Sequence, residues 1–296
     1  MQQLRIALAQ VAPRLGELEA NLERHRSIIR AARADGANLV VFPELGLTGY
    51  LLQDLAAEVA IRLDDPRLAA LAGETAGGGA AIVSFVEESG DHRLFIAAAL
   101  LEDGELRHVH RKVFLPTYGQ FDERRFFAAG DTIRATPSGL GGGLGVGIAV
   151  CEDFWHLGTP LLLALDGAQV LINVSSSPGR DLAARNEVGL GTATSWRTLM
   201  RTYAQLTTSF VVFVNRVGVD ESMTFWGGSE VISPSGDALY SAPFFDDDVY
   251  LVDLNLEDVR RERIALPLLR DERLELEARE LSRIIAERAG LVADTT

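Results

Sequence analysis

The chain contains a single cysteine, Cys151, at the end of an apolar run, "GVGIAV", that is typical of a buried strand. Two carboxylates, Glu152 and Asp153, follow it directly. Nearby anions raise the pKa of a thiol, so the local sequence disfavours a nucleophile. Cys151 is therefore either a small core residue, as free cysteines often are, or a nucleophile activated by groups that are distant in the sequence.

Two further residues that can do acid–base chemistry stand at the ends of apolar runs. Glu44 follows "NLVVF" and Pro43, and a proline biases the residue before it toward extended geometry. Glu44 thus falls at the carboxyl edge of a strand, where ligands bind in open α/β sheets. Lys112 ends the run "HVHRK". Taken singly, Glu44 is typical of a solvated turn and Lys112 of a surface, but with Cys151 they place an acid, an ammonium and a thiol after three strands.

Histidine is the familiar base for a catalytic cysteine. The chain has five, namely His25, His92, His108, His110 and His156. We expect His25 to be a structural residue of a helix and His92 to lie in a turn. His108 and His110 alternate with arginines, which is typical of a solvated face. His156 is close to the cysteine in sequence, but nothing else supports a papain-like site.

Three segments, in this order along the chain, resemble the signatures of the nitrilase (carbon–nitrogen hydrolase) superfamily. They are "FPELGLTGY", "RKVFLPTYGQFDERRFF" and "GVGIAVCED", and the late "ISPSGDALYSA" resembles a sheet-edge turn of that family. Within the superfamily they are most similar to the glutaminase domain of glutamine-dependent NAD synthetases. The resemblance implies that Glu44 is the general base, Lys112 the oxyanion stabiliser and Cys151 the nucleophile. It also implies that Glu123 orients the lysine and borders the substrate.

The physical chemistry of this grouping is coherent. Moving a proton from a free thiol to a free glutamate costs roughly 6 kcal/mol, and a neighbouring ammonium lowers that cost by stabilising the thiolate. Lys112 would also donate to the atom that becomes anionic in a tetrahedral intermediate, with a backbone N–H near Glu152 as a second donor. The activating groups then come from other strands, and we expect Glu152 and Asp153 to point away from the sulfur.

By position in the resembling motifs, four residues are candidates for contacting the substrate: Tyr118, Glu152, Phe154 and Ser176. Each has an ordinary structural alternative, since the aromatic residues could be core, Glu152 could bond a backbone turn and Ser176 lies in a loop of three serines. A carboxylate in the pocket would favour a substrate that carries an amine.

The resemblance implies an amidase that hydrolyses a small amide through a thioester to a carboxylate and ammonia, with no metal or organic cofactor. A nitrilase, or a glutaminase subunit that feeds a separate NAD synthetase, uses the same groups. A catalytically silent binding scaffold is the alternative outside enzymes. The chain ends at Thr296 without the glycine-rich loop of an ATP-dependent synthetase domain, so we expect a free-standing amidase whose substrate need not be glutamine.

Strands and helices alternate along the chain, which predicts one α/β domain over residues 1–296. The resemblance makes this a four-layer αββα sandwich that forms a homodimer or a higher homo-oligomer. Expected strands are 4–11, 38–42, 80–87, 93–102, a strand ending at 150, 169–175, 209–218, two short strands within 228–242, and 249–256. Expected helices are 17–35, 159–168, 183–208 and 271–289.

Composition limits the partners. The net charge is −14, and no stripe of lysine and arginine suits nucleic acid or an anionic membrane. One cysteine excludes an intrachain disulfide and a multi-cysteine metal site. We find no signal peptide and no membrane span, and therefore expect a cytoplasmic protein with a small-molecule substrate. The glycines of 139–147 precede a strand, which is the reverse of a nucleotide-binding loop.

Overall fold

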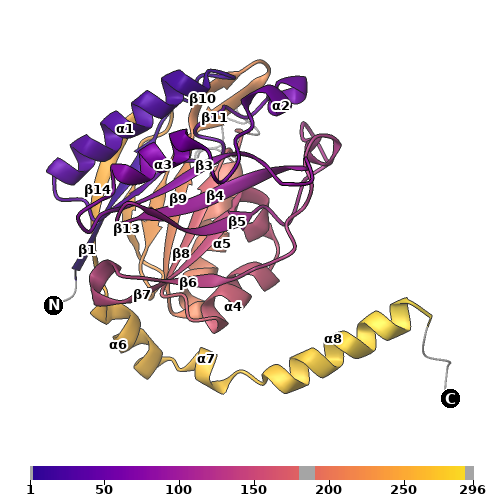
Figure 1. The fold of residues 1–296 in the computed structure, drawn as a ribbon. Helices are drawn as coiled ribbons and strands as arrows, with labels where there is room; N and C mark the ends of the chain where they lie inside the picture. The colour runs from indigo at the N-terminus through magenta and orange to yellow at the C-terminus, as the bar shows by residue number, and fades with distance from the viewer. Residues whose placement is uncertain (1–2, 180–190, 291–296) are drawn as a thin grey trace.

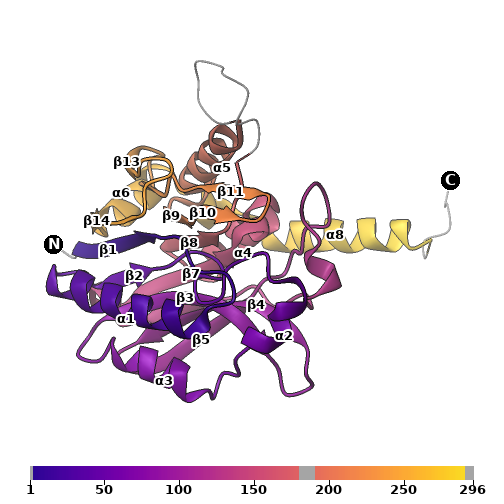
Figure 2. The same cartoon turned by 90° about the horizontal axis from the view of Figure 1, so that it is seen from above.

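Two six-stranded sheets pack face to face in the computed structural model, which describes residues 3–179 and 191–290. Figure 2 shows α1 and α3 outside the first sheet and α5 outside the second, so the molecule has four layers. The predicted αββα sandwich is confirmed.

The first sheet has the order β14-β1-β2-β3-β4-β5. Its strands are β1 (Gln3–Gln10), β2 (Leu39–Val41), β3 (Ala80–Glu88), β4 (Leu94–Glu102), β5 (Glu105–Arg111) and β14 (Asp248–Asn255). The second sheet has the order β13-β12-β9-β8-β7-β6. Its strands are β6 (Ala135–Ser138), β7 (Leu144–Val150), β8 (Val170–Ser175), β9 (Phe210–Asn215), β12 (Glu230–Ile232) and β13 (Ala238–Ser241). A separate hairpin joins β10 (Val217–Asp220) and β11 (Met223–Trp226).

The helices lie mainly on the outer faces of the two sheets. They are α1 (Leu18–Ala34), α2 (Ala56–Val59), α3 (Pro66–Gly73), α4 (Gly158–Leu165), α5 (Gly191–Thr207), α6 (Glu257–Ala265), α7 (Leu268–Asp271) and α8 (Leu274–Arg288). Short 3₁₀ turns in the described residues are η1 (Gln53–Leu55), η2 (Glu123–Arg125), η3 (Leu140–Gly142) and η4 (Cys151–Trp155).

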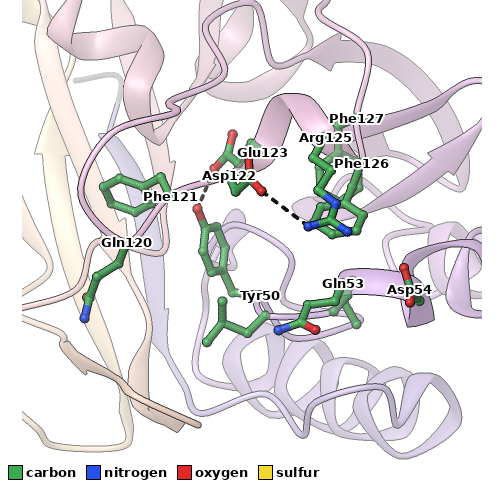
Figure 3. A pocket seen from close by; sticks show the side chains of 12 residues that line it. Tyr50, Gln53, Asp54, Gln120, Phe121, Asp122, Glu123, Arg125, Phe126 and Phe127 are labelled. Carbon is green, nitrogen blue, oxygen red and sulfur yellow. Dashed lines mark hydrogen bonds and ion pairs between the residues drawn. The ribbon is translucent and has the colours of Figure 1, made fainter.

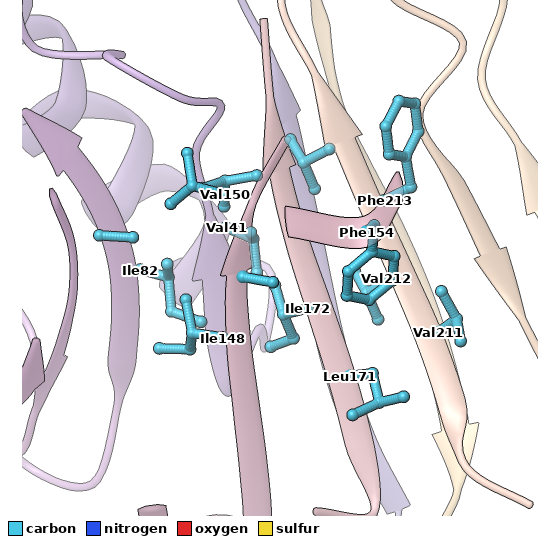
Figure 4. Close-up of a cluster of buried hydrophobic side chains, with 14 of the residues drawn as sticks. Val41, Ile82, Ile148, Val150, Phe154, Leu171, Ile172, Val211, Val212 and Phe213 are labelled. Atoms are coloured by element: carbon cyan, nitrogen blue, oxygen red, sulfur yellow. The ribbon is translucent and has the colours of Figure 1, made fainter. Parts of the chain in front are cut away.

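Central strands are apolar on both faces because both faces are covered. In β3, Ala80 and Ile82 join the core between the sheets, whereas Val83 and Phe85 join the core beneath α1 and α3. This division follows from the two-residue period of a strand. Figure 4 shows the inter-sheet core, where Ile82 of the first sheet lies near Ile148 of the second.

The glycine-rich approach to β7 has a packing role. A Cβ at Gly145 would lie 2.0 Å from the carbonyl oxygen of Gly167, so only glycine lets this strand approach the loop after α4. Gly141 has φ +56° and would place a Cβ 2.4 Å from Leu256 Cδ1. These contacts account for two of the glycines without a phosphate ligand.

Two element predictions need correction, and a third is described only in part. The strand expected over 209–218 is two strands, β9 and β10, and the β10–β11 hairpin was not predicted. Within the helix expected over 183–208, the structure has α5 (Gly191–Thr207), and residues 183–190 lie outside the described residues. The terminal helix begins at Leu274, buries none of its residues and extends away from the body in Figure 1. Along 3–179 and 191–290, no helix combines the length and the apolar character that crossing a membrane requires.

Candidate active site

The carboxyl ends of strands from both sheets meet at one edge of the sandwich. Glu44 follows β2, Lys112 follows β5 and Cys151 follows β7. β2 is parallel to β3, and β5 has the same direction because it is two antiparallel steps from β3. The shared direction brings the ends of β2 and β5 to the same edge, as the sequence predicts.

Lys112 joins two buried carboxylates. Its Nζ donates to Glu44 Oε1 and to Glu123 Oε1, each at 2.7 Å, and all three side chains are at least 96% buried. An ammonium is buried only when it is paired, so the two carboxylates together hold it in place. The predicted acid, ammonium and second glutamate therefore form one cluster.

The backbone at Cys151 has a conformation that residues of a regular strand do not adopt. Its φ is +43°, in the left-handed region that non-glycine residues rarely occupy. Asn173 holds this turn, because its Oδ1 accepts from Cys151 N–H at 3.0 Å and its Nδ2 donates to Cys151 O at 3.3 Å. Ser175 Oγ donates to the same Asn173 Oδ1. Sequence reasoning did not single out Asn173.

The charged groups of the cluster affect the pKa of the Cys151 thiol. Burial raises the pKa of Cys151 well above its ordinary value, Glu44 raises it further, and Lys112 lowers it. Burial alone would lower the pKa of Lys112, but the carboxylates of Glu123 and Glu44 raise it well above its ordinary value. Burial and the neighbouring carboxylates thus favour the protonated form of the Cys151 thiol, and the ammonium of Lys112 opposes them.

Ser176 holds Glu44 through two hydrogen bonds. Its backbone N–H donates to Glu44 Oε2 and its Oγ donates to the carbonyl oxygen of Glu44, both at 2.8 Å. The side chain is fully buried. Ser176 therefore positions Glu44, whereas the sequence suggested it as a substrate contact.

Tyr50 is a member of the cluster that sequence reasoning missed. Its hydroxyl donates to Glu123 Oε1 at 2.5 Å, and Asp220 Oδ2 accepts from its backbone N–H at 3.1 Å. Figure 3 shows Tyr50 directed at Glu123 on the wall of a cavity of about 250 Å³. The "TGY" that ends the first motif carried the signal, but a tyrosine six residues after Glu44 has no distinctive spacing.

Glu123 supplies a pH prediction. Burial raises its pKa to about 7, while Lys112 and the hydroxyl of Tyr50 oppose this shift. Because an ionised Glu123 holds Lys112 best, kcat/KM should rise with pH through this range, as a property of the coupled cluster. Tyr50→Phe removes a hydrogen-bond donor that lowers the pKa of Glu123. The rising limb of the kcat/KM pH profile should therefore move to higher pH by about 0.5–1 pH unit.

Tyr203→Phe is the matched control for Tyr50→Phe. It also deletes a hydroxyl with a buried hydrogen bond, here to the carbonyl oxygen of Phe154. Its pH profile of ammonia release should match that of the wild type. The assignment of the rising limb to Glu123 would be contradicted if the pH profile of Tyr50→Phe did not shift. It would also be contradicted if both variants shifted equally.

Cys151 opens on a cavity of about 530 Å³. The described residues lining it are Tyr118, Phe121, Cys151, Glu152, Trp155, Ser177, Pro178, Gly191, Thr192, Ser195 and Trp196. These described residues include one carboxylate and neither lysine nor arginine. The Tyr118 hydroxyl donates to both oxygens of Glu152, at 3.0 and 2.9 Å.

Two predicted substrate contacts, Tyr118 and Glu152, thus line the cavity with the thiol. The expectation that Glu152 points away from the sulfur is wrong, since Glu152 lines the same cavity and helps raise the pKa of Cys151. Phe154 is not in this lining. It is fully buried and packs edge-on against Tyr203, so its placement is that of a core residue.

The histidines take other places. His25 is buried and stacks on Phe42, as expected of a structural residue. His156 stacks on Phe114, with its Nε2 4.0 Å from Glu152 Oε1. The solvated face predicted for His110 is wrong, because His110 is 2% exposed and contacts Asp153. His108 on the same strand is half-buried.

Comparison with known proteins agrees with this geometry. The profile of the carbon–nitrogen hydrolase family matches residues 5–263. The chain belongs to the carbon–nitrogen hydrolase family. Members of this family are enzymes that act on non-peptide C–N bonds. The resemblance seen in the three motifs is therefore confirmed.

Curated relatives of this carbon–nitrogen hydrolase include two glutamine-dependent NAD(+) synthetases. The Thermotoga maritima protein is 33% identical over 273 residues, covering 90% of this chain and 45% of the relative. The Rhodobacter capsulatus protein is 35% identical over 256 residues, covering 84% and 43%. The chain therefore spans about half the length of the curated relatives it matches.

Two solved structures show the same fold over nearly their whole length. A carbon–nitrogen hydrolase from Helicobacter pylori has a TM-score of 0.81 at 26% identity, covering 94% of this chain and 98% of that one. A mutant of the amidase from Nesterenkonia sp. AN1 has a TM-score of 0.76 at 26% identity, covering 93% and 96%. That amidase carries the acetamide moiety of fluoroacetamide covalently added to its active-site cysteine.

Proposed function

We propose that this carbon–nitrogen hydrolase is a cysteine-dependent amidase that cleaves a small amide bearing an ammonium group. The proposal rests on one observation. Lys112 donates hydrogen bonds to both Glu44 and Glu123, and Cys151 lines a substrate-sized cavity. This grouping supports covalent catalysis of acyl transfer, with Cys151 as the nucleophile, Glu44 as the base and Lys112 as the cation that stabilises the oxyanion.

In the first half of the reaction, Cys151 transfers its proton to Glu44 as the sulfur bonds to the amide carbon. The oxygen that becomes anionic receives a hydrogen bond from Lys112. The N–H of Cys151 is taken by Asn173, so the N–H of Glu152 is the proposed second donor. Glu44 then returns the proton to the amide nitrogen, the C–N bond breaks and ammonia leaves a thioester.

In the second half, Glu44 removes a proton from water as the water oxygen bonds to the thioester carbon. The C–S bond breaks, Glu44 reprotonates the sulfur, and the carboxylic acid ionises. Glu44 begins and ends the cycle as a carboxylate. Ser176 and Lys112 each occupy one of its two oxygens in the resting state, which fixes its direction throughout.

The cavity lining supports an ammonium-bearing substrate. Burial raises the pKa of Glu152, and the hydrogen bond from Tyr118 opposes that shift. A substrate ammonium would pair with the buried carboxylate of Glu152, and the aromatic side chains of Tyr118 and Trp155 would favour a cation further. Glutamine and simpler amino amides both meet this requirement.

Ammonia release from four amides of similar size tests the proposal: glutamine, gamma-aminobutyramide, butyramide and glutaramic acid. We expect both ammonium-bearing amides to exceed butyramide in kcat/KM, and glutaramic acid to be the poorest. Glu152→Gln should reduce the preference for an ammonium about tenfold or more, because a charged hydrogen bond is lost. Asp122→Asn, which changes an exposed carboxylate of the neighbouring cavity, should keep it.

Equal use of all four amides, or loss of the preference in both variants, would overturn the ammonium assignment. No ammonia from any amide, with turnover of butyronitrile, would indicate a nitrilase instead.

The curated relatives favour a second candidate function, that of a glutaminase that delivers ammonia to an NAD synthetase. Both relatives described above are glutamine-dependent synthetases at 33% and 35% identity. This function predicts that glutamine exceeds gamma-aminobutyramide by a wide margin, and that a synthetase partner raises turnover.

A further inference from the structure

We infer that Asp153, held by His110, is a positioning residue that sets Lys112 relative to Cys151. The inference rests on the proposed function, since it assigns these two residues a part in the same chemistry. Asp153 is fully buried and lies two residues after the nucleophile.

The carboxylate of Asp153 accepts four hydrogen bonds. Oδ1 accepts from the backbone N–H groups of Val113 and Phe114, each at 3.0 Å. Oδ2 accepts from Val150 N–H at 3.0 Å and contacts His110 Nε2 at 2.8 Å. Each of the four partners lies within two residues of Lys112 or Cys151 in the sequence.

These partners lie within or shortly after strands of two different sheets. Val113 directly follows Lys112 at the end of β5, and Val150 directly precedes Cys151 at the end of β7. Strands of separate sheets share no backbone ladder, so another group must fix their relative positions. The hydrogen bonds that join residues 110–114 to residues 150–153 all use the Asp153 carboxylate.

His110 completes this arrangement from the strand itself. It is two residues before Lys112 on β5, so its side chain leaves the strand on the same face as that of Lys112. Burial alone would raise the pKa of Asp153, but the bond from His110 and the backbone donors lower it overall. A carboxylate that stays ionised accepts from both strand ends at once, which a neutral group of the same shape cannot do.

The experiment compares His110→Leu, His110→Gln and Asp153→Asn. Leucine removes the donor to Asp153, whereas the side-chain amide of glutamine can keep an N–H near the position of Nε2. The amide introduced by Asp153→Asn would turn a donor toward Val150 N–H and so break the bond to the strand that carries the nucleophile. Leu71→Ala is the stability control, because it opens a cavity beneath α3, outside the site.

Three readouts are measured: kcat and KM for ammonia release, the rate of Cys151 alkylation by iodoacetamide, and the melting temperature. We expect kcat to fall about 10²-fold in His110→Leu and Asp153→Asn, the cost of a small misplacement of reacting groups, with KM nearly unchanged. Alkylation should slow in parallel. His110→Gln should recover most of both rates, and Leu71→Ala should lose melting temperature but neither rate.

Equal losses in His110→Gln and His110→Leu would overturn the inference, as would a loss confined to KM or one reproduced by Leu71→Ala. If Asp153→Asn does not fold, the two His110 variants decide the question. The alkylation rate separates this inference from the proposed function, because it reports the setting of Cys151 even if the wild type releases no ammonia from any amide.

Discussion

Replacing Cys151 with alanine should lower kcat/KM for ammonia release by about 10⁴-fold or more, the scale seen when a nucleophile is removed. The fold should persist, because alanine fits the space of a small buried side chain and the turn is held by Asn173 through backbone atoms. Amide hydrolysis and thermal unfolding of the same preparation measure both effects.

A trapped intermediate provides the control. Wild-type protein quenched in acid during turnover should carry the acyl group as an added mass on the peptide that contains Cys151. The alanine variant should carry none. Undiminished hydrolysis in Cys151→Ala, or an acyl group on any other residue, would disprove the nucleophile assignment.

Replacing Lys112 with methionine should have the second largest effect, on both activity and stability. The variant loses the donor to the oxyanion and leaves Glu44 and Glu123 as buried carboxylates without their cation. Breaking a buried ion pair in this way typically costs about 3–5 kcal/mol of the free energy of unfolding. Removing an oxyanion donor typically lowers kcat by about 10²–10³-fold, and we expect at least that loss.

The stability deficit of Lys112→Met should depend on pH. The pKa of Glu123 is already raised to about 7 in the wild type, and Lys112 opposes that rise. Without Lys112 the pKa in the folded state is higher still. A carboxyl with a raised folded-state pKa contributes stability below its unfolded value near 4.3, and that contribution is lost as pH rises through the folded value. The deficit should therefore be small at pH 5 and large at pH 8.

Urea unfolding of wild type and Lys112→Met at both pH values measures this difference. Adding Glu123→Gln to Lys112→Met removes one of the two stranded carboxylates and should restore part of the stability at pH 8. The same deficit at pH 5 and pH 8, or no recovery in the double variant, would show that the cluster is not held together by these charges.

The sequence alone singled out the three candidate residues and gave the reason why Glu44 and Lys112, at the ends of two strands of one sheet, lie at the same edge. Glu44, Lys112 and Cys151 each follow an apolar run, and side chains at the carboxyl ends of strands are presented to one edge of a sheet. The order of strands and helices was also sufficient to indicate a covered sheet. Those signals are local or periodic, so they survive without knowledge of the fold. Compartment and oligomeric state stay predictions.

Only the tertiary structure decided how the cluster is supported. Ser176 bonds Glu44 across 132 positions of sequence, and His110 meets Asp153 across 43. The alternation of His110 with arginines suggested a solvated face, but β5 packs against β7 of the other sheet, and that face is closed. Phe154 likewise follows the cysteine by three residues yet turns into the core with η4. Burial at such positions depends on which strands of two separate sheets lie opposite each other, and no short sequence pattern specifies that pairing.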